Sequence, residues 1–60
     1  LGPIAYYKCL RLNAVRTFMR ANPLVPIADV ARVHGFHHLG NFAADYRRLF
    51  GERPSETVRG

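Results

Sequence analysis

Few side chains in this sequence of 60 residues are placed to do chemistry on a bound molecule. His34, His37 and His38 are spaced as metal ligands on one continuous helix would be, but Gly35 interrupts such a helix. The single cysteine, Cys9, lies far away in the sequence, the acidic residues are scattered, and no glycine-rich phosphate loop is present. We therefore expect no metal, no cofactor and no enzymatic activity, and we expect His34 to be a half-buried packing residue.

A large excess of positive charge indicates a different chemistry, the binding of a polyanion. Nine Lys and Arg residues stand against four Asp and Glu residues, which gives a formal charge of +5. In so short a chain this excess favours nucleic acid over a membrane surface as the partner. No apolar run reaches the roughly 18 residues that a membrane span needs, and the lone cysteine fits a reducing cytoplasm.

The length of the chain limits its architecture to one small domain. A domain of this size buries only about 60% of the surface that its unfolded chain exposes, so a deep catalytic cleft is not expected. The sequence begins at Leu1 rather than Met, from which we expect a piece of a longer protein that senses its signal elsewhere.

Helical periodicity dominates the sequence, and no strand pattern competes with it. Residues 3–20 are predicted to form a long helix that begins at Pro3, a residue suited to the first turn of a helix. Its broad apolar face should consist of Ile4, Tyr7, Leu10, Leu12, Val15, Phe18 and Met19. Asn22, Pro23 and Pro26 then mark a turn.

Three shorter helices are expected after this turn. Residues 27–34 show a brief helical pattern that stops at Gly35, and residues 38–50 give the best-defined helix, which Gly51 ends. The core face of helix 38–50 should hold Leu39, Phe42, Ala43, Tyr46, Leu49 and Phe50. A last short helix is predicted over residues 54–59. The predicted fold class is all-α, a small helical bundle preceded by a long helix.

Residues 27–50 have the features of a helix-turn-helix of the homeodomain-like kind. Two short helices joined by a tight turn need a small residue where they cross and a residue that accepts positive φ, and Ala31 and Gly35 meet these needs. In such a motif the second helix lies in the major groove of DNA. DNA contacts are then expected from His37, His38, Gly40, Asn41, Ala44, Arg47 and Arg48.

These residues suit different parts of a duplex. Asn41 is the one neutral side chain on the outward face that can make two hydrogen bonds to a base, with adenine as the favoured partner. Gly40 and Ala44 offer close approach or, for Ala44, contact with a thymine methyl group. Phosphate contacts are expected from Arg47, Arg48 and either Arg11 or Arg16. Asp45 is expected to form an ion pair with Arg48 or Arg16.

The segments "PIAYYKCLRLNAVR" and "IADVARVHGFHHLGNFAADYRRLFGERPSETVR" resemble the C-terminal part of the DNA-binding region of AraC/XylS-family transcription regulators. In that family, a long linking helix joins two helix-turn-helix motifs that read successive major-groove segments. The resemblance implies that residues 1–60 are a single partial DNA-binding domain, with residues 3–20 as the linking helix and residues 27–50 as the second motif. It also implies a first motif upstream and an effector-binding or oligomerising domain outside this chain, and it leaves open whether the regulator activates or represses transcription.

The sequence departs from the family pattern at several positions. Pro26 replaces the Ser or Thr that usually caps the following helix, and His37 and His38 stand where serines are common. Long polar side chains often read bases at the positions of Leu39, Gly40 and Ala44, which are apolar or small here. Direct base readout by this motif is therefore expected to be modest.

Two functions remain open from the sequence. The first is sequence-specific binding of double-stranded DNA, with helix 38–50 in the major groove, in a cytoplasmic, nucleoid-associated regulator of bacterial type. The alternative is a protein-interaction module whose basic helical face docks an acidic partner such as a polymerase subunit, which makes RNA polymerase a second candidate partner. The two differ in salt dependence, because a protein that neutralises phosphates binds DNA less tightly as salt rises.

Overall fold

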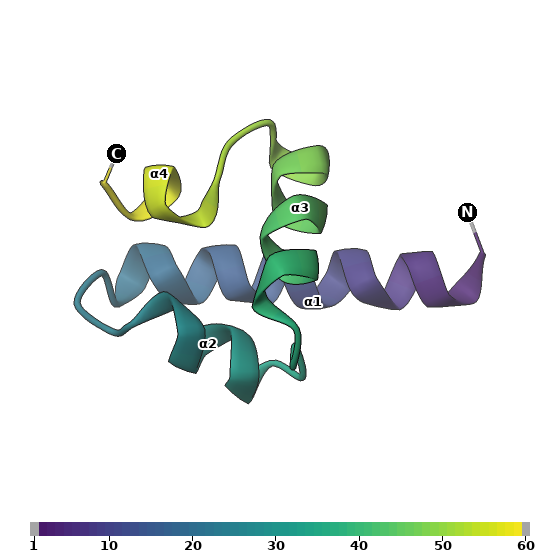
Figure 1. Cartoon of the computed structure of the whole chain (residues 1–60), viewed down its shortest axis with the longest axis horizontal. Helices are drawn as coiled ribbons and strands as arrows, with labels where there is room; N and C mark the ends of the chain where they lie inside the picture. Colours follow the sequence, from purple (N-terminus) through teal and green to yellow (C-terminus); the bar gives the residue numbers. More distant parts are fainter. Residues whose placement is uncertain (1, 60) are drawn as a thin grey trace.

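The computed structural model describes residues 2–59, and these residues form four helices without a strand (Figure 1). The helices are α1 (Pro3–Ala21), α2 (Ile27–Val33), α3 (Leu39–Phe50) and α4 (Pro54–Arg59). Every bound lies within one residue of the bound predicted from the sequence, and the all-α class is confirmed. The ends of the predicted domain, Leu1 and Gly60, lie outside the described residues. None of the described helices is long and apolar enough to cross a membrane.

Glycine and proline set the turns around α2 and α3. Pro26 precedes α2 without a side-chain cap, and its carbonyl oxygen accepts the first hydrogen bond of the helix, from the N–H of Val30 at 3.1 Å. Gly35 adopts a φ of 89°, a left-handed conformation that side chains with a Cβ rarely tolerate. Gly51 ends α3 in the same way, with a φ of 76° and an N–H that donates to the carbonyl oxygen of Arg47 at 2.8 Å.

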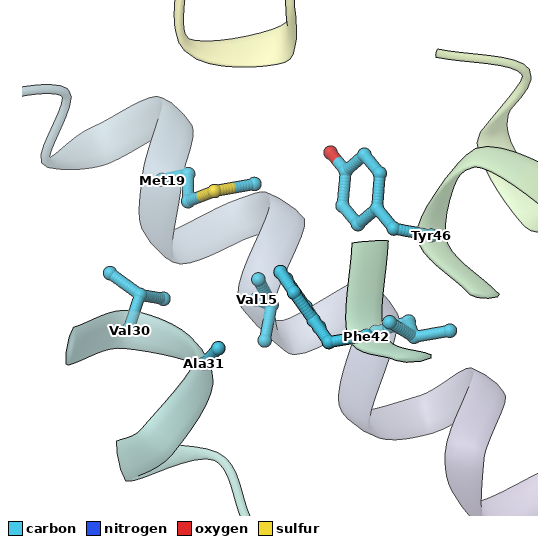
Figure 2. Packing of buried hydrophobic residues seen from close by; sticks show 7 residues of the cluster. Val15, Met19, Val30, Ala31, Phe42 and Tyr46 are labelled. Carbon is cyan, nitrogen blue, oxygen red and sulfur yellow. The ribbon is translucent and has the colours of Figure 1, made fainter. Parts of the chain in front are cut away.

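The core lies where α2 and α3 meet the C-terminal half of α1. Its side chains are at most 2% exposed, and Figure 2 shows how they converge from the three helices. They are Leu12, Val15, Met19, Val30, Ala31, Phe42 and Tyr46. Burial of each large side chain contributes about 1.5–3 kcal/mol to the stability of the fold. Ala31, the small residue predicted at the helix crossing, is fully buried among them. This small core fixes how α3 is rotated about its own axis.

The apolar face predicted for α1 was too broad. Leu12, Val15 and Met19 are buried, but the other predicted members, Ile4, Tyr7, Leu10 and Phe18, are exposed. Figure 1 shows the reason for the residues near the N-terminus, because that end of α1 extends past the other three helices, which gather around its middle and C-terminal half. Phe18 lies in the C-terminal half, where its ring meets that of His34 but stays partly exposed. The stripe that holds the core residues therefore continues along α1 into a part that no described element covers.

The core face predicted for α3 also needs correction at its ends. Phe42 and Tyr46 are buried as expected, whereas Leu39 and Leu49 are 45% and 42% exposed. Leu39 opens the first turn of α3 and Leu49 lies in its last turn, where the neighbouring helices no longer cover the inward face. Helical periodicity gives the direction of a side chain but not the length over which another element covers it.

A hydrogen-bonded chain attaches α4 to α3. The hydroxyl groups of Tyr46 and Thr57 lie 2.7 Å apart in a buried contact, and the hydroxyl of Thr57 also donates to a carboxylate oxygen of Glu52. Because Thr57 has a single hydroxyl proton and gives it to Glu52, the Tyr46 hydroxyl must donate to Thr57. The carboxylate of Glu56 accepts from the N–H of Arg53 at 2.9 Å, which satisfies one free donor at the start of α4. Helix α3 is thus held from the side opposite α2.

Candidate nucleic-acid interface

The outward face of α3 carries most of the residues predicted to contact DNA. Phe42 and Tyr46 point into the core, so the residues about 180° away around the helix must point outward. The exposed residues of this face are Gly40, Asn41, Ala44, Arg47 and Arg48. His37 and His38 are exposed just before the first turn. The structure places five of the seven predicted contacts along one face of α3 and the other two, His37 and His38, just before its first turn. Their contact with DNA remains a prediction.

The first turn of α3 is open to an anion. His38 precedes the helix in an extended conformation without a side-chain cap, and no acidic residue lies in the first turn. The first backbone hydrogen bond of the helix runs from the N–H of Phe42 to the carbonyl oxygen of His38 at 2.9 Å. The N–H groups before Phe42 have no carbonyl partner within the helix, and together with the helix dipole they favour a negatively charged ligand.

The two arginines at the end of α3 differ in their surroundings. A nitrogen of Arg48 lies 3.4 Å from a carboxylate oxygen of Asp45, although 80% of the Arg48 side chain is exposed. The other oxygen of Asp45 lies 3.2 Å from the ammonium group of Lys8 on α1. Arg47 makes no ion pair within residues 2–59. Arg47 is therefore freer than Arg48 to bind a phosphate.

The ion pair between Lys8 and Asp45 was not predicted from the sequence, which gave Arg48 or Arg16 as partners of Asp45. The predicted ion pair of Asp45 with Arg48 is confirmed, and the predicted pair with Arg16 is wrong. The guanidinium of Arg16 instead lies 4.9 Å from the centre of the Phe50 ring, and its Nε is buried without a partner in the described structure. Because Arg16 is half-buried and packs against this ring, it is less accessible to a phosphate than an exposed arginine is. Of the two α1 arginines proposed for the flanking backbone, only Arg11 stays exposed.

Between the N-terminal half of α1 and the start of α3 lies an open cleft of about 490 Å³. Helix α1 contributes Lys8 and Arg11, and the segment before α3 contributes His37 and His38. Asn41 lines the same cleft and also belongs to the outward face of α3. The polar side chains in its wall are Tyr7, Lys8, Arg11, His37, His38, Asn41 and Asp45. Lys8 was not predicted as a residue of this site, although its spacing of three from Arg11 places both on neighbouring parts of one helix face.

His34 takes the packing role predicted for it. Its ring is half-buried and meets the Phe18 ring edge to face at 5.9 Å between centroids. Its Nδ1 lies 2.7 Å from the carbonyl oxygen of Val30, which identifies Nδ1 as the protonated donor. Within residues 2–59 no three potential metal-ligating side chains gather at one place.

Comparison with known proteins identifies the family. A family model described as a helix-turn-helix domain matches residues 1–60. The chain belongs to the AraC/XylS-type helix-turn-helix family. Domains of this family bind DNA in transcription regulators, and the four-helix fold described above agrees with that membership. No solved structure matches the chain.

Several curated regulators resemble this AraC/XylS-type domain. The "XylDLEGF operon transcriptional activator 2" of Pseudomonas putida is 41% identical over 59 residues, which cover 93% of this chain and 37% of that protein. The "XylDLEGF operon transcriptional activator" of the same organism is 40% identical over 60 residues, covering 95% of this chain and 18% of the relative. The "Probable thc operon regulatory protein" of Rhodococcus erythropolis is 36% identical over 59 residues, covering 95% and 18%. The chain thus spans well under half the length of these relatives.

Proposed function

We propose that this chain binds double-stranded DNA in a sequence-dependent way by inserting α3 into the major groove, as part of a transcription regulator. The observation that carries the proposal is the exposed face of α3, where a base-reading side chain, Asn41, is combined with small neighbours and no acid among its exposed residues. A helix of this kind can approach base edges closely, because Gly40 and Ala44 add little bulk between the backbone and the groove. Family membership and the curated activators support the same function.

Each part of the interface has a separate task. Asn41 reads a base, for which its amide suits the N6 and N7 atoms of adenine. Arg47 binds a backbone phosphate, and the open N–H groups in the first turn of α3 bind another. Gly40 and Ala44 allow close approach, and Ala44 can contact a thymine methyl group. His37 and His38 lie where the duplex backbone passes the start of the helix.

The long helix α1 serves as the linking helix in this proposal. Its exposed apolar residues Ile4, Tyr7 and Leu10 support a role in packing against a further helical motif, because neighbouring exposed apolar side chains often mark an interaction surface. The relatives are several times longer than this chain, and an effector-binding domain in the intact regulator is part of the proposal. Location at the bacterial nucleoid and contact with RNA polymerase are further proposals that follow from the regulatory role.

Selection from a pool of random duplexes tests the function directly. The chain is incubated with the pool at two salt concentrations, and retained molecules are sequenced. We expect an enriched short motif, and we expect Asn41→Ala to reduce discrimination between that motif and random DNA by about 1–3 kcal/mol while nonspecific affinity stays nearly unchanged. Asn13→Ala is the matched control, because Asn13 is an exposed asparagine on α1 whose amide bonds to the carbonyl oxygen of Cys9.

The outcomes separate the competing functions. Equal losses on specific and random DNA would remove Asn41 as a base reader. Retention that depends on salt without an enriched motif would mean that the chain binds phosphates and leaves sequence recognition to another part of the regulator. No retention at all would exclude the DNA-binding function for this chain and favour the docking of an acidic protein.

A further inference from the structure

The cleft between α1 and the start of α3 concentrates positive charge next to the reading face. Lys8 and Arg11 line it from α1, and His37 and His38 line it from the segment before α3. The one carboxylate in its wall is that of Asp45, and the ammonium group of Lys8 lies 3.2 Å from it. Asp45 shares its single negative charge between Lys8 and Arg48, and Arg11 is the cation of α1 in this cleft that has no ion-pair partner among residues 2–59.

The turn between α2 and α3 provides the space in which Arg11 lies. A Cβ atom placed on Gly35 would lie 3.4 Å from a terminal nitrogen of Arg11 and 3.8 Å from its central guanidinium carbon. The guanidinium thus passes directly over the backbone of Gly35, where any side chain would touch it. This places a cation from α1 beside the turn that leads into the recognition helix, although the two residues are 24 positions apart in the sequence.

Arg11 has a position without an internal partner. Its side chain is exposed, and no hydrogen bond or ion pair joins its guanidinium to another of the described residues 2–59. Arg16 on the same helix is half-buried against Phe50, and Lys8 is occupied by Asp45. A guanidinium presents several N–H donors in a planar arrangement that matches two phosphate oxygens at once. Among the basic residues of α1, Arg11 is the one whose surroundings fit an external anion beside α3.

We infer that Arg11 binds a backbone phosphate of the same DNA duplex whose major groove receives α3, an inference that rests on the proposed function. The link between the two contacts is Asn41, which lines the cleft and also belongs to the outward face of α3. A duplex that brings a base to Asn41 therefore places its adjoining backbone over the cleft. The Arg11 contact fixes how far along the groove α3 sits, because phosphate contacts set register while base contacts set specificity.

The contact also joins α1 to the segment before α3 at a place outside the core that already packs the two helices together. Arg11 belongs to α1, and α3 meets this half of α1 through the ion pair between Lys8 and Asp45. A phosphate held by Arg11 and by the segment before α3 adds a second connection, one that exists only in the complex. Binding of DNA then stabilises the angle between α1 and α3.

Two charge-matched variants test the inference in the full 60-residue chain. Arg11→Gln removes the proposed contact, and Arg20→Gln removes an exposed positive charge nine residues later on α1. Nine residues correspond to about 14 Å along the helix and a rotation of about 180°, so Arg20 lies on the opposite face. Both variants lower the net charge by one, so long-range effects of charge are equal in the two and drop out of the comparison between them. Dissociation constants for a selected duplex and a random duplex are measured across a range of salt concentrations, and thermal melts confirm that each variant is folded.

Arg11→Gln is expected to flatten the slope of log Kd against log salt by about 0.9, the effect of one phosphate. The dissociation constant of the variant divided by that of the unmodified chain should therefore fall by about 3.5-fold when salt rises from 50 to 200 mM. The loss should be the same on selected and random duplexes, since a phosphate carries no sequence information. Arg20→Gln should leave the slope unchanged. Arg11→Lys, which keeps the positive charge, should have a slope close to that of the unmodified chain. The affinity for inorganic phosphate alone should not differ measurably between the unmodified chain and Arg11→Gln.

The results distinguish failure of this inference from failure of the proposed function. If the unmodified chain selects a DNA motif but Arg11→Gln leaves the salt slope unchanged, the phosphate contact is refuted and DNA reading by α3 stands. If Arg11→Gln and Arg20→Gln flatten the slope equally, the effect is one of net charge, and the contact is likewise refuted. If the unmodified chain binds no duplex, both proposals fail together. A difference between the variants for inorganic phosphate would indicate a site for a free anion in place of a backbone contact.

Discussion

The hydrogen bond between Tyr46 and Thr57 allows a sharp test of how α3 is held, because removing its two ends should destabilise the fold by unequal amounts. Tyr46→Phe deletes the donor and leaves Thr57 bonded to Glu52, so the loss should be that of an ordinary net hydrogen bond, about 0.5–1.5 kcal/mol. Thr57→Val preserves the shape of the side chain but leaves the Tyr46 hydroxyl without an acceptor. Tyr46 is fully buried, so that hydroxyl has no access to water, and the cost should be about 1–3 kcal/mol in addition to the lost contact with Glu52.

The double variant decides whether this reasoning is correct. With Val at position 57, the change Tyr46→Phe removes a stranded hydroxyl and should be neutral or stabilising, whereas with Thr57 present the same change should be destabilising. Urea unfolding followed by far-UV circular dichroism at neutral pH gives the four free energies of unfolding. In a domain of this size about 1 kcal/mol corresponds to roughly 4–8 °C in Tm, so thermal melts can check the signs independently. Equal losses from Tyr46→Phe in both backgrounds would refute the donor assignment and the buried bond with it.

The remaining predictions concern charge and the turn. Arg47→Gln should flatten the salt slope of DNA binding by about one unit and Arg48→Gln by clearly less, because Asp45 already neutralises part of Arg48; equal slopes in titrations would contradict this difference. Asp45→Asn should release Lys8 and Arg48 and thereby strengthen binding to random duplexes and steepen the slope, at a stability cost of about 0.2–1 kcal/mol per lost pair. Weaker random binding by this variant would show that the ion pairs mainly position α3. Gly35→Val should unfold the motif or misplace α3, since a β-branched residue resists a φ of 89°; native-like melting and DNA binding would refute that requirement.

The helices could be predicted from the sequence because local signals mark their ends. Pro3, Pro26, Gly35 and Gly51 each stand at a boundary, and each acts through its own backbone, either by a fixed φ or by tolerance of a positive one. Such constraints need no knowledge of the rest of the fold. For the same reason the outward face of α3 followed from periodicity once Phe42 and Tyr46 were assigned to the core.

Contacts between distant segments could not be predicted in the same way. Periodicity identified Ile4 as a core residue of α1 because it lies on the same stripe as Leu12, but it is 81% exposed where no described helix covers it. The pair of Asp45 with Lys8 was missed for the same reason: Arg16 was predicted as the partner on α1, and the crossing point of the helices brings Lys8 to Asp45 in its place. The position of Arg11 over Gly35 depends on that crossing point as well.

The attachment of α4 also has a consequence for the order of events in folding. A helix of six residues is too short to persist in isolation, so α4 forms only when it docks on α1, whereas α1 is long enough to begin forming before the rest of the fold. We therefore expect α4 to dock late in folding and to be released in local opening, which hydrogen exchange at its backbone N–H groups can measure. Because Tyr46 loses its acceptor in that event, release of α4 loosens α3 at the same time. The segment after Gly51 is therefore expected to govern how long α3 keeps its place between openings.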